Sequence, residues 1–115
     1  MGYFTIFHLY VYEENGYKPI DEFHPSFHKI VCYINHLLGE GVAEDFFKYH
    51  SYEAKWYNWK NDMKDMAKAF PSLYFELEGR GEDLADWWQA VFHGTEASIR
   101  QAQLIPPEDS AYKPL

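Results

Sequence analysis

The 115-residue chain is predicted to form an α+β domain, with a mostly antiparallel sheet and two helices packed on one face. Three observations predict this class. Residues 51–57 and 73–78 alternate apolar and polar side chains, as half-buried strands do. Between these two segments, apolar residues recur over 59–70 with the period of a helix. A second apolar stripe with the same period covers residues 27–38.

The N-terminal half is predicted to hold a strand followed by a helix. Residues 3–12 are aromatic and β-branched nearly throughout, which is typical of a central strand covered on both faces. In the helix over 27–38, Pro25 is expected in the first turn and Gly39 just after the last turn. Residues 40–49 are compatible with a further short helix or with a packed loop.

The middle of the chain is predicted to be a strand–helix–strand unit. Asn58 is expected to cap the helix, and Pro71 to end it. A helix of this length is sufficient for a crossover connection, so the flanking strands are expected to be parallel and the crossover right-handed. The second strand is expected to end in a loop at Gly79 and Gly81.

Two interpretations compete beyond this unit. Residues 83–92 show helical spacing, but residues 86–92 and 96–105 also form a plausible hairpin that turns at His93-Gly94. The short spacing and the glycine favour the hairpin. The predicted domain then spans 1–107, and residues 108–115 are a C-terminal tail.

Composition restricts the function. The net charge is −8, which opposes nucleic-acid binding and favours a basic partner. Cys32 is the single cysteine, so an internal disulfide is excluded, and its place in the helical stripe predicts a buried, inert thiol. No apolar run reaches the length of a membrane span, so a cytoplasmic protein is expected. Aromatic residues make up 20% of the chain, which suits either an interface or a ring-rich core.

Two groups of residues have some features of metal sites. His24 and His28 have the i, i+4 spacing of a zinc site on a helix, but Pro25 between them favours a position for His24 before the helix. The acids within 76–86 have the composition of a two-metal carboxylate site, although alternating acids on a strand are more often a solvated face. No metal, cofactor or catalytic residue is therefore predicted.

One run of the chain resembles a known family. It comprises Lys55-Trp56-Tyr57, Phe70-Pro71, Phe75-Glu76-Leu77-Glu78-Gly79-Arg80-Gly81-Glu82, Asp86-Trp87 and Phe92-His93-Gly94. This pattern, within about residues 50–95, resembles uncharacterised, small ferredoxin-like proteins of phages and mobile elements. The resemblance implies a ferredoxin-like fold, the cytoplasm of a host bacterium and no catalytic residues. It also favours the hairpin.

The leading hypothesis is a non-enzymatic protein that binds a host protein through an acidic and aromatic surface. Its narrower form is an inhibitor of a host defence system such as CRISPR. The predicted partner-binding residues are Glu76, Glu78, Glu82, Asp83, Asp86, Trp87 and Trp88. A first alternative is a single-stranded nucleic-acid-binding module that uses the Lys/Trp strip at 55–68, namely Lys55, Trp56, Trp59 and Lys60. A second alternative is a small metal-dependent enzyme.

Overall fold

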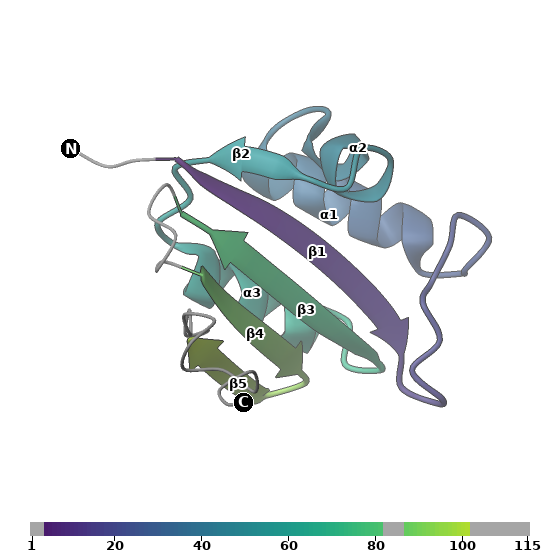
Figure 1. Ribbon diagram of the computed structural model, residues 1–115. Helices are drawn as coiled ribbons and strands as arrows, with labels where there is room; N and C mark the ends of the chain where they lie inside the picture. Colours follow the sequence, from purple (N-terminus) through teal and green to yellow (C-terminus); the bar gives the residue numbers. More distant parts are fainter. Residues whose placement is uncertain (1–3, 82–86, 102–115) are drawn as a thin grey trace, which may run out of the picture.

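The computed structural model describes residues 4–81 and 87–101, which form an antiparallel sheet covered by helices (Figure 1). In these ranges the sheet has five strands in the order β2-β1-β3-β4-β5. The strands are β1 (Thr5–Glu13), β2 (Tyr52–Ala54), β3 (Leu73–Arg80), β4 (Trp87–His93) and β5 (Glu96–Gln101). The helices are α1 (Phe27–Leu38), α2 (Val42–Phe47) and α3 (Trp59–Ala69). All of these helices lie behind the sheet in the view of Figure 1.

The α+β class and the antiparallel sheet are confirmed, but the ferredoxin-like topology is not. The described elements follow the order β-α-α-β-α-β-β-β, whereas a ferredoxin-like domain follows β-α-β-β-α-β. α2 is a third helix. It lies within residues 40–49, which the sequence left as either a short helix or a packed loop. The predicted tail at 108–115 lies outside the described residues.

The strand–helix–strand unit is present, with β1 inserted into it. Both β2 and β3 pair antiparallel with β1, so β2 and β3 are parallel to each other but not adjacent. The central position of β1 is thus confirmed. The expectation that both faces of β1 are covered is wrong: Leu9 is 5% exposed, whereas Tyr10 is 40% exposed. The reason is that α1, α2 and α3 all pack on the same side of the sheet.

The core lies between the helices and one face of the sheet. Alternate strand residues point into it, among them Phe7, Leu77 and Phe92, each at most 1% exposed. Aromatic rings fill much of this space. The ring of Phe7 lies 5.1 Å from that of Trp56 and 6.0 Å from that of Trp88, both edge-on. Part of the high aromatic content is therefore used to pack the core.

The helix boundaries agree with the predictions except at Pro25. α1 begins at Phe27, so Pro25 precedes the helix rather than lying in its first turn, because residues 21–24 already form a turn in which His24 N–H donates to Asp21 O. Gly39 follows α1 with φ +126°, and its N–H donates to the carbonyl of Asn35. Asn58 precedes α3 as expected, although its side chain makes no capping hydrogen bond to the backbone.

The C-terminal hairpin is confirmed, and a helix over the described residues 87–92 is wrong. β4 pairs with β5 around a turn in which Gly94 has φ +61°. Trp88, Ala90 and Phe92 share the buried face, as the alternation predicted. The hairpin satisfies the β4 backbone on both edges, through β3 and β5.

The strand was expected to end at Gly79, and this is wrong. Gly79 lies inside β3 and pairs with Trp88 of β4. The Trp88 indole lies directly over Gly79. A Cβ atom at position 79 would be 2.2 Å from Cζ2 and 2.4 Å from Cε2 of that ring. Glycine is therefore required at this position by the close approach of a neighbouring ring, not by a turn.

Candidate binding face

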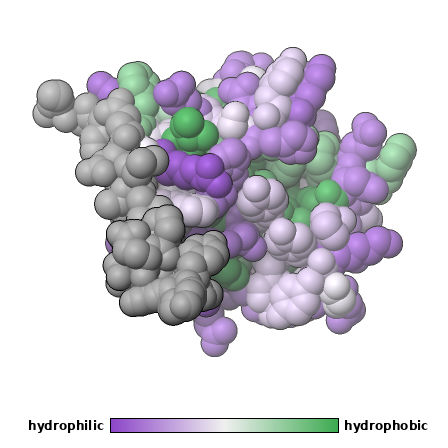
Figure 2. Space-filling view, in the orientation of Figure 1, coloured by the Kyte–Doolittle hydropathy of each residue, from purple (hydrophilic) through white to green (hydrophobic). Residues whose placement is uncertain are grey.

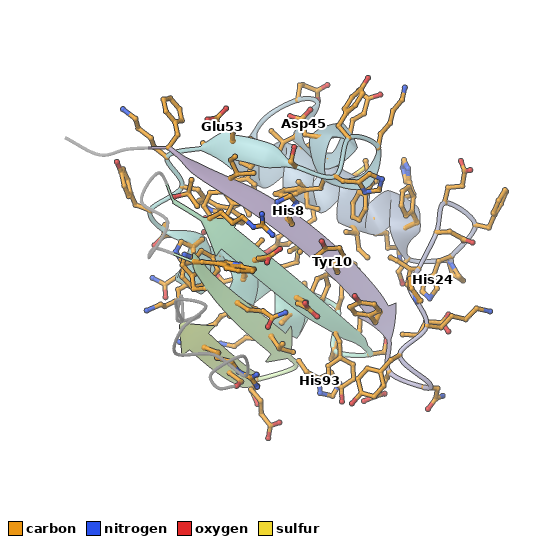
Figure 3. All side chains as sticks on the ribbon, in the orientation of Figure 1. His8, Tyr10, His24, Asp45, Glu53 and His93 are labelled. Carbon is orange, nitrogen blue, oxygen red and sulfur yellow. The ribbon has the colours of Figure 1, made fainter. Side chains whose placement is uncertain are left out.

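The sheet has one face that the helices leave uncovered, here called the open face. Because opposed residues in an antiparallel ladder point to the same side, the strand register identifies its members. They are Glu53 of β2, Ile6, His8, Tyr10 and Tyr12 of β1, Tyr74, Glu76, Glu78 and Arg80 of β3, Trp87, Gln89, Val91 and His93 of β4, and Glu96, Ser98 and Arg100 of β5. Figure 3 looks onto this face, with His8 and Tyr10 on β1 and His93 at the far end of β4.

The centre of the open face holds two carboxylates fixed by their neighbours. Glu78 Oε2 accepts a hydrogen bond of 2.6 Å from Trp87 Nε1 and lies 3.8 Å from Arg80 Nη2. The Arg80 guanidinium lies 4.7 Å from the centre of the Trp87 ring. Glu76 Oε2 accepts a hydrogen bond of 2.5 Å from Gln89 Nε2. These contacts orient both carboxylates, and each keeps acceptor capacity because a carboxylate has about four lone-pair sites.

One end of the open face is aromatic. The Tyr74 ring stacks on His93 at 4.0 Å and 13°, and the Tyr17 ring lies 5.0 Å from Tyr74. His93 Nε2 lies 3.0 Å from Glu14 Oε2, which joins β4 to the turn after β1. The pKa of the Tyr74 hydroxyl is raised above its usual 10.0, mainly by a hydrogen bond with Tyr17 and to a lesser extent by burial. A hollow of about 440 Å³ lies beside this ring pair.

Figure 2 shows part of the open face, which is a mixed, hydrophilic to near-neutral surface with hydrophobic side chains at scattered points. Ile6 and Tyr10 are 39% and 40% exposed. Since tyrosine and tryptophan have both an apolar ring and a polar group, such a surface suits a polar interface better than a lipid-like one. None of the described helices is long and apolar enough to cross a membrane.

The structure brings together only some of the predicted partner-binding residues. Glu76, Glu78 and Trp87 lie side by side on the open face. Trp88 points the other way: it is 9% exposed, and its ring stacks on that of Trp59 at 3.9 Å. Its assignment to a binding surface is therefore wrong, because consecutive strand residues face opposite sides of a sheet. Glu82, Asp83 and Asp86 lie outside the described residues.

In the Lys/Trp strip at 55–68 both tryptophan rings pack inward, whereas the ring of Tyr57 is exposed. Trp56 is 9% exposed, and its Nε1 donates a hydrogen bond of 2.7 Å to Asp62. Trp59 is half-buried and stacks on Trp88. Lys55 and Lys60 are exposed, but both tryptophan rings needed for base stacking belong to the core packing.

The histidines considered as metal ligands have other contacts. His24 precedes α1; its Nε2 lies 3.2 Å from Glu13, and its Nδ1 accepts from the N–H of Ser26. His28 Nε2 lies 3.6 Å from Sγ of Cys32. Across residues 4–81 and 87–101, no group of three or more His, Cys, Asp or Glu side chains is arranged to hold a metal.

Cys32 was expected to be buried, and this is wrong, because its thiol is exposed. α1 buries Ile30 and Ile34 against the sheet, and Cys32, halfway between them along the chain, faces away. A helix turns by about 100° per residue, so a position two residues from a buried one lies near the opposite side.

Sequence reasoning missed the β1 part of the open face, in particular Tyr10 and Tyr12. The available signal was that His8, Tyr10 and Tyr12 alternate with Phe7, Leu9 and Val11, so that within residues 7–12 every polar group lies on one side of the strand. Burial, and to a lesser extent the nearby charge of Glu76, raises the pKa of Tyr12.

Scans of protein-family models, curated proteins and solved structures found no match to this chain.

Proposed function

We propose that the protein is a non-enzymatic binding protein whose open face recognises a basic surface of a partner protein. The observation that supports this most is the juxtaposition of fixed carboxylates with accessible rings. Glu76 and Glu78 lie half-buried in a row with Tyr10 and Trp87 as neighbours. Carboxylates bind arginine through paired hydrogen bonds, and tyrosine and tryptophan faces attract the same guanidinium group.

The charge of the whole chain supports the same type of partner. A net charge of −8 accelerates encounter with a basic surface and disfavours encounter with nucleic acid. Tyrosine, tryptophan and arginine are also the residues that dominate binding energy at protein interfaces. The open face presents all three types.

The narrower proposal concerns the identity of the partner. The resemblance to phage and mobile-element proteins suggests a host protein, and the carboxylates of the open face suggest one that itself binds nucleic acid. A CRISPR effector or another defence protein has such a basic surface. In this proposal the carboxylates of the open face occupy the positions that phosphates would take.

The test is quantitative affinity capture from lysate of a bacterial host. The bait variant combines Tyr10→Ala with Glu76→Lys, which removes one ring and reverses one charge on the open face. The matched control combines Tyr57→Ala with Asp65→Lys, because Tyr57 is 69% exposed and Asp65 is exposed on α3. Both variants change the net charge equally, and circular dichroism and thermal melting verify that each folds.

The expected result is a stoichiometric, basic partner that the control variant retains and the open-face variant loses. Partner loss that is equal for the two variants would mean that general charge, not the open face, is responsible. A low-salt gel shift with single-stranded DNA accompanies the capture. Tight, salt-sensitive binding of DNA would contradict the proposal.

A further inference from the structure

A second hollow shares no lining residue with the open face. It has a volume of about 770 Å³, is open to solvent and is lined by α1, α2 and the connection that leads from β1 into α1. This connection runs beside the start of α1 in Figure 1. We call this hollow the helical groove. Its volume is within the range of about 300–1,000 Å³ that is typical of ligand pockets.

The floor of the helical groove is apolar. The rings of Phe27 and Phe47 meet there with centroids 5.2 Å apart, and Val31 and Ile20 lie beside them. All four side chains are only half-buried, although α1 and α2 already bury Ile30, Ile34 and Phe46 in the core. The floor is thus apolar area left over after the core is formed, and covering it would be favourable.

The rim of the helical groove is anionic. Asp21 and Glu22 line it from the connection, Glu40 from the segment that leads into α2, and Glu44 from α2 itself. Lys48 is the one cation among its lining residues, and it lies 3.6 Å from Glu44. Three carboxylates of the rim therefore make no ion pair within the described residues. Such a rim repels phosphate and other anions and attracts cations.

The combination of floor and rim selects the chemistry of the occupant. A neutral apolar segment would cover the rings but leave the rim charges unpaired, and a purely cationic ligand would leave the floor exposed to water. We infer that the helical groove binds a peptide segment of a partner protein in which apolar side chains are flanked by lysine or arginine. This inference does not rest on the function proposed for the open face, because the two surfaces share no residue.

The experiment measures fluorescence anisotropy with a short fluorescein-labelled peptide in which leucine alternates with arginine. Two further peptides serve as probes: one in which leucine alternates with glutamate, and one in which glycine alternates with arginine. The proposal requires that only the leucine–arginine peptide binds well. Equal binding of the glycine–arginine peptide would overturn it, because attraction to net charge alone would then suffice.

Variants of the protein locate the binding. Glu22→Gln with Glu40→Gln removes two rim charges and is expected to weaken binding by roughly fivefold, as exposed ion pairs contribute little each. Val31→Arg places a cation in the floor and is expected to abolish binding. The charge-matched control is Glu53→Gln with Glu96→Gln, two exposed acids of β2 and β5 that do not line the groove.

The control variant is expected to bind the leucine–arginine peptide as the unmodified protein does. If the control weakens binding as much as the rim variant, or if Val31→Arg binds normally, the groove is not the site. Absence of binding by the unmodified protein at low salt would also overturn the inference. Weaker binding by the control would place the peptide on the open face, where Glu53 and Glu96 lie. Normal binding by Val31→Arg, or no binding by the unmodified protein, would leave the open-face proposal to its own test, since Tyr10→Ala with Glu76→Lys changes no residue that lines the groove.

Discussion

Gly79→Ala should destabilise the protein through a single contact with Trp88. The added Cβ would lie 2.2 Å from Cζ2 of the indole, whereas carbon atoms in contact are about 3.5–4.0 Å apart. The ring would have to move by more than about 1 Å. It has little room to do so, because Trp59 stacks on it at 3.9 Å and only 9% of Trp88 is exposed.

The magnitude follows from two opposing effects. Overpacking a core typically costs about 1–3 kcal/mol, and the upper half of this range applies here because the ring is held by its stacking partner. Replacing glycine by alanine within a strand recovers about 0.5–1 kcal/mol through the reduced entropy of the unfolded chain. We therefore expect Gly79→Ala to lower the free energy of unfolding by about 2 kcal/mol, or the Tm by about 8 °C.

The assay is urea denaturation followed by tryptophan fluorescence, applied to a double-mutant cycle. Trp88→Leu removes the large ring and is itself destabilising, by about 2–4 kcal/mol. In the Gly79→Ala background it should cost about 1–3 kcal/mol less, because the clash is then gone. Gly94→Ala is the control: its φ of +61° is strained for alanine, but nothing lies within 4 Å of its added Cβ.

Two results would refute this explanation. One is additivity of Gly79→Ala and Trp88→Leu within about 0.5 kcal/mol, which would mean that the two positions are not in contact. The other is a Gly79→Ala protein as stable as the original. Coupling of similar size between Gly94→Ala and Trp88→Leu would show that the cycle reports a general effect of destabilisation.

Three further predictions concern single side chains. Asp62→Ala should lower the free energy of unfolding by about 1.5–3 kcal/mol in urea titration, because the Asp62 carboxylate accepts a hydrogen bond of 2.7 Å from the buried Trp56. The control Asp65→Ala, at an exposed position of the same helix, should change this free energy by less than about 0.5 kcal/mol. Burial, and to a lesser extent the charge of Asp45, raises the pKa of Tyr52 above 10.0, so the folded state holds this proton more tightly than the unfolded state does. The resulting contribution to the free energy of unfolding is complete below pH 10 and is lost as the pH rises through the folded pKa, so Tyr52→Phe should reduce the loss of stability between pH 9 and pH 11. The exposed thiol of Cys32 should react with a disulfide reagent in the folded protein as fast as in urea, and a slow reaction released only by urea would contradict its position.

Much of the candidate site could be predicted from alternation within single strands. The alternation of Glu76 and Glu78 with apolar neighbours placed both on one exposed side, and the hairpin placed Trp87 beside them. The assignment of Trp88 failed because the site was defined by proximity along the chain, whereas a strand separates consecutive residues onto opposite faces. The sequence also did not reveal that the tryptophans of the Lys/Trp strip pack in the core. Aromatic residues suit cores and binding surfaces equally, and composition does not distinguish the two.

The sequence by itself determined most of the helices and strands and the apolar side of most of them, because these follow from periodicity over a few residues. It left residues 40–49 and 83–92 open between two structures, and it did not distinguish the two sides of β1. Tertiary structure decided the rest. The insertion of β1 between β2 and β3 depends on hydrogen bonds between strands more than forty residues apart, and backbone groups pair equally well with many partners. The role of Gly79 depends on the ring of Trp88 across the ladder, and the open face exists because all the described helices pack on one side. Local periodicity predicts none of these three features, since each depends on contacts between residues that are distant in the sequence.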